Sequence, residues 1–219
     1  LTPEYQKRFV QQMYHESGDN SPQWPGQYCW PEGFMRRFAQ YGGNRINLVI
    51  TPDLALDIRN SAKTLFTQIH MNSRFDETGA VPRLGADVPQ WFGESIGFWD
   101  GEALISWTSN IQGWISHGGN EYSNQLQTIE IYTPRKDAAG KFLGLLQETV
   151  FYDPDALAQP LRLYTHMNRV YDLNEGDPRV FVECLQTIYP LEGRMTPVVP
   201  GKEITTVAPD WYGRPWAEL

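Results

Sequence analysis

The apolar positions at the start of the chain predict a short helix. They recur at helical spacing and so form one stripe along a helix: Tyr5, Phe9, Val10 and Met13. Thr2 and Pro3 are typical of a helix start, because Thr caps the first backbone N–H groups and Pro suits the first helical position. The Gly- and Pro-rich segment 18–26 ends this helix and leads into an arm that reaches residue 43.

From residue 44 to residue 189 the pattern changes to short runs in which apolar and polar positions alternate. The runs are rich in β-branched and aromatic residues and are separated by turn residues. They predict strands at Ile46–Ile50, Leu54–Ile58, Leu65–Met71, Phe92–Trp99, Ala103–Ser109, Leu126–Thr133, Phe142–Tyr152, Leu161–Tyr171 and Val180–Tyr189.

No stretch of helical periodicity separates these strands, which disfavours a parallel βαβ arrangement. We expect an all-β fold, namely an antiparallel up-and-down β-barrel of the lipocalin type with about eight or nine strands, because closure removes exposed strand edges. A β-sandwich is the alternative. We predict a single domain over residues 1–219, with the barrel at 44–189 and an irregular Pro-rich tail at 190–219.

The Asp100-Gly101 pair predicts a two-residue type I′ hairpin turn. Counting outward from this turn pairs Trp99 with Glu102 and Glu94 with Trp107. One face of the hairpin is then mostly apolar and carries one carboxylate, and we expect it to face the barrel interior: Glu94, Ile96, Phe98, Ala103, Ile105 and Trp107.

A carboxyl group in an apolar interior can act as a general acid or base near neutral pH, which makes Glu94 the first catalytic candidate. The alternative is a solvated or arginine-paired Glu94 at the rim. Further catalytic candidates are polar residues that alternate with apolar ones on other strands: Glu130, Glu148, His70 and His166. Each of these alone is more often a structural or surface residue. We expect the substrate pocket to be lined by Trp107, Phe98, Ile96, Tyr122, Asn120 and Tyr164.

Composition narrows the possible functions. The 219 residues include 18 Lys+Arg and 26 Asp+Glu, which gives a formal net charge of −8. This acidic balance argues against nucleic acid binding, and no apolar run is long enough to span a membrane. Nucleotide, metal and nucleophile motifs are missing from the sequence, so we expect no cofactor and no metal. The spacing of Cys29 and Cys184 leaves open whether they are buried thiols or one disulfide.

The hairpin segment 91–108 reads W-F-G-E-S-I-G-F-W-D-G-E-A-L-I-S-W-T. It resembles a family of bacterial, mostly exported proteins of uncharacterised function, whose hallmark is approximately W-[YF]-G-H-S-I-G-H-W-E-G-D-T-L-V-V-D-T. The resemblance, which extends sparsely over residues 1–187, implies a periplasmic or secreted location and a disulfide between Cys29 and Cys184. Glu94 and Phe98 stand where the family has His, and Trp107 where it has Asp, which argues against His-based chemistry in this chain.

Together these features predict a cofactor-independent acid–base enzyme, a lyase, isomerase or cyclase, that acts on a hydrophobic aromatic or terpenoid small molecule inside the barrel. A non-catalytic, lipocalin-like carrier of lipophilic ligands is one alternative. A structural or partner-binding barrel with a filled interior is another. The sequence does not decide the oligomeric state, and a homodimer stays open.

We predict one disulfide between Cys29 and Cys184 in protein exported to an oxidising compartment. Mass spectrometry of unreduced protein should then show one linked peptide pair and no free thiol. Quantitative labelling of two thiols in freshly purified exported protein would contradict the pairing.

Overall fold

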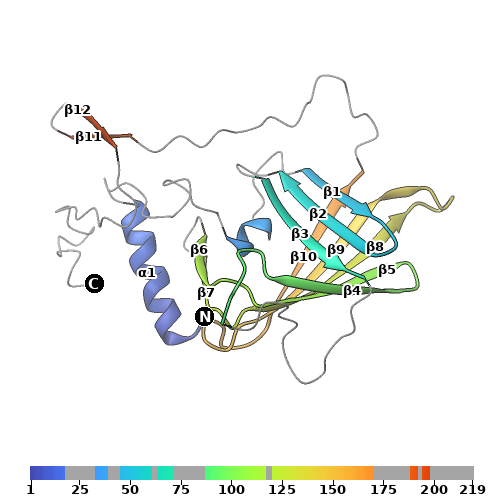
Figure 1. Cartoon of the computed structure of the whole chain (residues 1–219), viewed down its shortest axis with the longest axis horizontal. Helices are drawn as coiled ribbons and strands as arrows, with labels where there is room; N and C mark the ends of the chain where they lie inside the picture. The colour runs from blue at the N-terminus through green and yellow to red at the C-terminus, as the bar shows by residue number, and fades with distance from the viewer. Residues whose placement is uncertain are drawn as a thin grey trace.

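The computed structural model describes residues 1–17, 33–38, 45–60, 64–71, 87–116, 120–169, 188–191 and 194–197. The architecture is mostly β, with a curled eight-stranded sheet that forms a half-barrel and one N-terminal helix (Figure 1). Cys29 and Cys184 lie outside the described residues, as do residues 180–187 of the last predicted strand. The disulfide therefore stays a prediction.

The helical elements are α1 (Pro3–Ser17) and the 3-10 helix η2 (Phe34–Phe38). The half-barrel contains β1 (Arg45–Ile50), β2 (Leu54–Asn60), β3 (Thr64–His70), β4 (Glu94–Asp100), β5 (Ala103–Ser109), β8 (Gln127–Lys136), β9 (Phe142–Tyr152) and β10 (Leu161–Asn168). Two separate hairpins pair β6 (Trp114–Ser116) with β7 (Asn120–Tyr122) and β11 (Ile188–Leu191) with β12 (Arg194–Pro197). The predicted runs match the sheet strands to within a few residues, but the predictions missed β6, β7 and β12.

The strands of the half-barrel lie side by side in chain order, and every neighbouring pair is antiparallel except β3 and β4, which are parallel. The prediction of a wholly antiparallel up-and-down arrangement was therefore wrong at one place. The physical reason is the length of the connection: a parallel pair needs a long crossover, and β3 ends at His70 whereas β4 begins only at Glu94. Among the described strands, β1 and β10 are the two edges.

Helix α1 begins where the sequence predicted. The carbonyl oxygen of Thr2 accepts the first helical hydrogen bond from Gln6 N at 2.8 Å. The hydroxyl of Thr2 donates to the carbonyl of Asp155 at 2.7 Å, which ties the start of α1 to the connection between β9 and β10. Farther along the helix, Arg8 binds Glu121 of β7 at 2.8 Å. These two contacts, one from Thr2 and one from Arg8, hold α1 beside the β9–β10 connection and β7. None of the helices in the described part of the chain is long and apolar enough to cross a membrane.

The β4–β5 hairpin turns at Gly101 and Glu102, not at Asp100 and Gly101. Asp100 pairs with Ala103, and Gly101 has a φ of +58° whereas Glu102 does not have a positive φ. Glycine with positive φ at the first of two central positions is the pattern of a type II′ turn. The turn thus lies one residue later in the chain than predicted, and each residue of β4 pairs with a β5 residue two positions beyond the predicted partner. Each face keeps the membership that the sequence predicted, but Glu94 lies opposite Ser109.

The inner face of the half-barrel is identified by a contact between strands that are far apart in the sheet. Asp57 of β2 and Tyr132 of β8 are separated by three intervening strands, which in a flat sheet would place them about 19 Å apart. Their side chains are nevertheless hydrogen-bonded at 2.8 Å, which only the concave side of a curled sheet allows. The prediction that Glu94 and Ile96 face inward was therefore wrong, because the alternate positions of β4 and β5 share the side of Tyr132.

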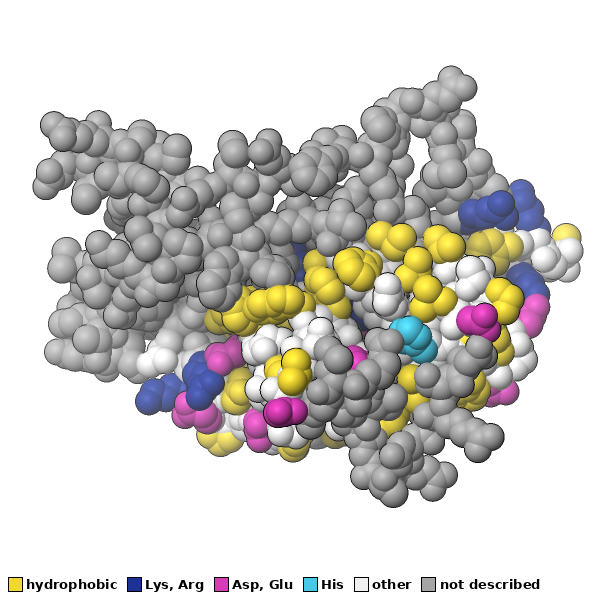
Figure 2. All heavy atoms as spheres, viewed as in Figure 1, with side chains coloured by type: hydrophobic (Ala, Val, Ile, Leu, Met, Phe, Trp, Pro, Cys, Tyr) yellow, Lys and Arg dark blue, Asp and Glu magenta, His cyan; other side chains and the backbone are white. Residues whose placement is uncertain are grey.

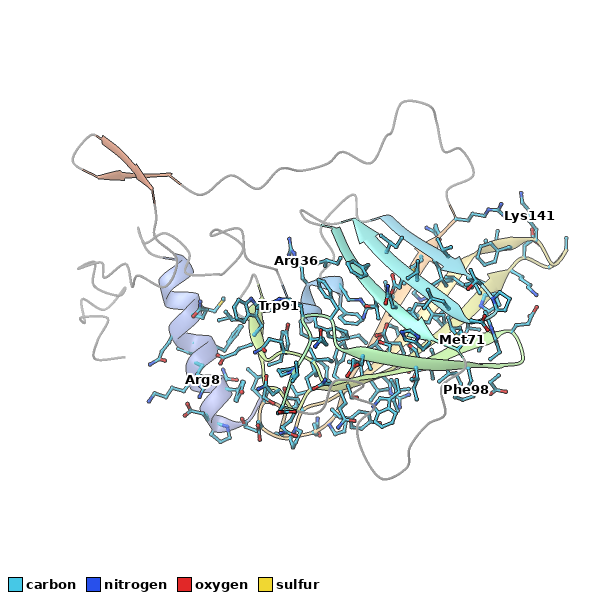
Figure 3. The ribbon with its side chains drawn as sticks, in the orientation of Figure 1. Arg8, Arg36, Met71, Trp91, Phe98 and Lys141 are labelled. Carbon is cyan, nitrogen blue, oxygen red and sulfur yellow. The ribbon has the colours of Figure 1, made fainter. Side chains whose placement is uncertain are left out.

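Two apolar clusters occupy the inner face. One contains Ala55, Ile69, Leu104 and Tyr132, with Leu48, Met71 and Leu145 packed against them. The other contains Phe34, Ile111, Tyr122, Leu126 and Phe151, and η2 is part of it. Figure 3 places Met71 on the inner side of β4 and Phe98 on its outer side. Polar side chains fill the inner face between these two clusters.

We predict that Gly97→Ala destabilises the protein by about 1–3 kcal/mol through overpacking. A Cβ at Gly97 would lie 2.6 Å from Ile69 Cγ2 and 2.9 Å from the carbonyl oxygen of Ile105. Urea unfolding of Gly97→Ala, Ile69→Ala and the double variant measures this effect. We expect the double variant to lose less than the sum of the single losses, and strict additivity would exclude the close contact as the cause.

Candidate functional site

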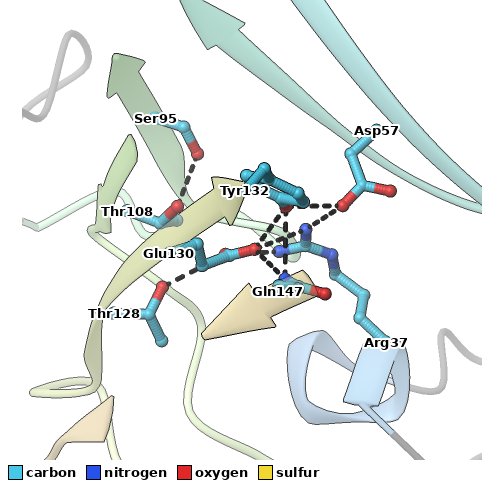
Figure 4. Close-up of polar contacts among 8 residues, drawn as sticks. All are labelled: Arg37, Asp57, Ser95, Thr108, Thr128, Glu130, Tyr132 and Gln147. Atoms are coloured by element: carbon cyan, nitrogen blue, oxygen red, sulfur yellow. Dashed lines mark hydrogen bonds and ion pairs between the residues drawn. The ribbon is translucent and has the colours of Figure 1, made fainter. Parts of the chain in front are cut away.

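A buried polar group on the inner face of the half-barrel is formed by Arg37, Asp57, Glu130, Tyr132 and Gln147, which we call the Arg37 cluster (Figure 4). Its members come from η2, β2, β8 and β9, so segments far apart in the chain meet at one point. The side chains of Arg37, Asp57 and Glu130 are 0–1% exposed. The cluster is thus a charged group inside the fold.

Helix η2 positions Arg37 by packing its aromatic residues beside the sheet. The Phe38 ring meets the ring of Phe151 edge-on at 4.9 Å, and Phe34 lies in the same apolar cluster. The Arg37 guanidinium lies 4.9 Å from the Phe34 ring centre and 5.3 Å from the Phe38 ring centre. These rings hold the cation on its apolar sides and leave its N–H groups to the carboxylates.

Arg37 binds both carboxylates of the cluster. Its Nη2 donates to Asp57 Oδ2 at 2.7 Å, while Nη1 and Nη2 reach the two oxygens of Glu130 at 3.1 and 3.2 Å. Burial alone would lower the pKa of Arg37. The opposing charges of Glu130 and Asp57 outweigh burial and hold this pKa above its ordinary value. Arg37 is therefore a permanent cation in the interior.

Tyr132 connects the same two carboxylates a second time. Its hydroxyl lies 2.6 Å from Glu130 Oε2 and 2.8 Å from Asp57 Oδ2. Gln147 Nε2 donates to Glu130 Oε2 at 2.8 Å, and Thr128 Oγ1 lies 3.4 Å from the other oxygen of Glu130. A phenol has one proton, so it can donate to only one of the two carboxylates at a time. The arrangement can therefore pass a proton between Asp57 and Glu130.

Buried hydroxyl groups continue from the cluster across β3, β4 and β5. Ser95 and Thr108 share a hydrogen bond of 2.7 Å and are buried (Figure 4). Ser106, opposite Glu130, and Thr67, opposite Asp57, are buried on the same face. Hydroxyls and charged groups on the concave side of a sheet provide hydrogen-bonding positions for a small molecule.

Of the five predicted catalytic residues, Glu130 belongs to the Arg37 cluster. The alternation of β3, β4, β9 and β10 places the other four on the outer face: His70, Glu94, Glu148 and His166. Glu94 is buried there and accepts a hydrogen bond from Asn110 Nδ2 at 2.9 Å. Glu148 forms a surface ion pair with Arg162. The five candidates therefore do not converge on one site.

The predicted substrate-lining residues are also mostly outside the half-barrel. Ile96, Phe98, Trp107 and Tyr164 lie on the outer face, where Phe98 and Tyr164 are 44% and 55% exposed. Apolar side chains can be seen along the visible surface of the sheet, with acidic side chains among them (Figure 2). Tyr122 is buried beside η2, where its hydroxyl accepts the backbone N–H of Phe34 at 2.6 Å. The side chain of Asn120 lies outside the described residues.

Sequence reasoning missed four members of the cluster: Arg37, Asp57, Tyr132 and Gln147. One signal was available for Asp57 and Gln147, since each is a polar residue in the middle of a run rich in Leu. Tyr132 follows Glu130 at the spacing that places both on one face of a strand. Arg37 had no such signal, because its position depends on how η2 packs. In the described ranges, no group of three or more His, Cys, Asp or Glu side chains is placed to hold a metal ion.

We predict that Arg37→Met lowers the free energy of unfolding by about 3–5 kcal/mol, because it leaves two carboxylates buried without their cation. Arg8→Met is the matched control: Arg8 also binds two carboxylates, Glu4 and Glu121, but at the surface, and should cost less than about 1 kcal/mol. Urea unfolding measures both. Equal losses in the two variants would show that the buried position of Arg37 has no special cost.

Comparison of the chain with protein-family models, with curated proteins and with solved structures found no match.

Proposed function

We propose that the inner face of the half-barrel binds a small molecule and that the Arg37 cluster transfers protons to and from it without a cofactor. The observation that carries this proposal is the position of the Tyr132 hydroxyl, 2.6 Å from Glu130 and 2.8 Å from Asp57. Two carboxyl groups joined by one phenol form a unit in which a proton can be received at one end and released at the other.

The surroundings of the unit support acid–base chemistry. The cluster is excluded from water, and electrostatic interactions are stronger in such a site than in water. Arg37 supplies a fixed positive charge that stabilises a carboxylate left after proton release. Gln147 and Thr128 orient Glu130 by hydrogen bonds from β9 and β8. Positioned donors of this kind need no rearrangement when charge develops.

The chemistry that fits is isomerisation, elimination or cyclisation. In an isomerisation, Glu130 takes a proton from one substrate carbon while Asp57, protonated at the start, gives its proton to another carbon, so no proton is gained or lost over the cycle. Tyr132 restores the starting state by passing the proton between Glu130 and Asp57. The apolar side chains beside the cluster, Ile69 and Leu104 among them, favour a substrate that is mostly hydrophobic.

A non-catalytic, lipocalin-like carrier is the second candidate, and one observation favours it. Both oxygens of Glu130 already lie within hydrogen-bonding distance of donors from Arg37, Tyr132, Gln147 and Thr128. A carboxylate whose oxygens already accept these hydrogen bonds has no position for a substrate proton until one of the donors moves. In a carrier, the same group would only fix the orientation of a bound ligand.

We also propose a periplasmic or secreted location. The support is the resemblance of segment 91–108 to a family of exported proteins, together with the two cysteines that this resemblance pairs. Fractionation of cells that produce the natural, full-length protein tests the location directly.

We predict that Glu130→Gln and Tyr132→Phe each lower turnover by about 10²–10⁴-fold, because neither replacement can exchange the proton. Incubation with extracts of hydrophobic metabolites, followed by mass spectrometry, detects both retained and converted compounds. Glu148→Gln is the matched control, since Glu148 lies on the same sheet but on its outer face.

The outcomes separate the two candidates. Full turnover in both cluster variants, or loss of turnover in Glu148→Gln alone, would remove the cluster from catalysis. Compounds retained but never converted would identify a carrier. Circular dichroism and thermal unfolding show whether each variant is folded, and Tyr132→Phe, which removes one oxygen only, keeps the test valid if Glu130→Gln is unstable.

A further inference from the structure

Two buried hydroxyl groups on the inner face have no hydrogen-bond partner within the described part of the chain: Thr67 Oγ1 and Ser106 Oγ. Their residues are 3% and 1% exposed. Buried polar side chains in folded proteins almost always have a partner, because an unpaired hydroxyl costs its full desolvation free energy. These two groups therefore require an explanation outside the hydrogen bonds of the fold.

Each hydroxyl lies beside one carboxylate of the Arg37 cluster. Thr67 on β3 is the register partner of Asp57 on β2, and Ser106 on β5 is the register partner of Glu130 on β8. Register partners on one face have their Cβ atoms about 4.5–5.5 Å apart. The two hydroxyls thus mark the same two ends of the proton-transferring unit that Tyr132 connects.

From this placement we infer that Thr67 and Ser106 bind an uncharged hydrogen-bonding group, a hydroxyl or a carbonyl, on an otherwise apolar ligand. The inference rests on the proposed function and specifies its substrate class. A hydroxyl side chain can both donate and accept, which suits either group. Asp57 and Glu130 repel an anion at this position, and an ammonium group would lose its hydration beside carboxylates that Arg37 already binds. Ile69, Leu104 and Met71 supply apolar contacts for the rest of the ligand.

The inference is tested with four small probes that share a four-carbon chain and differ in their polar group: 1-butanol, 2-butanone, butyrate and butylammonium. Saturation-transfer NMR measures the binding of each probe to the full chain. We expect the alcohol and the ketone to bind and the two ions not to bind. Thr67→Val and Ser106→Ala should each weaken binding of the neutral probes about tenfold, the effect of one lost hydrogen bond.

Thermal unfolding without probe supplies an independent measurement. Thr67→Val keeps the shape of the side chain and removes a hydroxyl that has no partner, so it should raise Tm by about 2–4 °C. A variant that is more stable and yet binds less well is the signature of a group kept for a ligand. Thr133→Val is the matched control, because Thr133 is exposed on the outer face of β8 and should change neither quantity.

Three results would overturn the inference: a lower Tm in Thr67→Val, equal binding of neutral and charged probes, or unchanged binding in both hydroxyl variants. The first would mean that water or protein already satisfies the hydroxyl. None of these results affects the loss of turnover expected for Glu130→Gln. Conversely, binding that depends on Thr67 and Ser106 without any turnover would leave this inference standing and refute the proposed catalysis.

Discussion

A guanidinium group that is cut off from water needs carboxylates close to it, and Arg37 binds two that lie on strands separated by three others in the sheet. Asp57 lies on β2 and Glu130 on β8, so both can reach one cation only if the sheet curls around it. The curl of the half-barrel and the position of η2 are therefore tied to one buried ionic contact. Breaking such a contact costs far more than its formation gains, because the remaining charges stay buried.

This constraint also explains the unusual chemistry of the two sheet faces. The concave side carries a cation, two carboxylates and a series of hydroxyls between two apolar clusters. The convex side carries isolated aromatic residues and surface ion pairs such as Arg162 with Glu148. An interior that holds charge must hold it in fixed hydrogen bonds, and fixed groups are what proton transfer requires. The same arrangement thus serves stability and any chemistry done there.

Local pattern determined what could be predicted from the sequence. Alternation located the strands of the sheet, and it also determined which residues share a face of β4 and β5. It could not decide which face turns inward, because Ile96, Phe98 and Trp107 look more like core residues than Ser95, Gly97 and Ser106. That choice depends on Arg37, whose position comes from the packing of Phe34 and Phe38. Glu130 was predicted because it alternates with apolar residues along one strand. Its partners were not predicted, because charge pairing between distant strands leaves no periodic pattern in the sequence.

The parallel contact of β3 with β4 has a consequence for the order of folding. It joins β1–β3 to the remaining five strands of the sheet through only two register pairs, Ile69 with Ser95 and His70 with Ile96. The other contacts of the sheet join strands that follow one another closely in the chain, so each side can form from local contacts before this seam closes. The Arg37 cluster spans the seam. Opening the sheet at this seam would separate Asp57 from Glu130, so the two sides of the sheet can stay together only while Arg37 keeps both of its carboxylates.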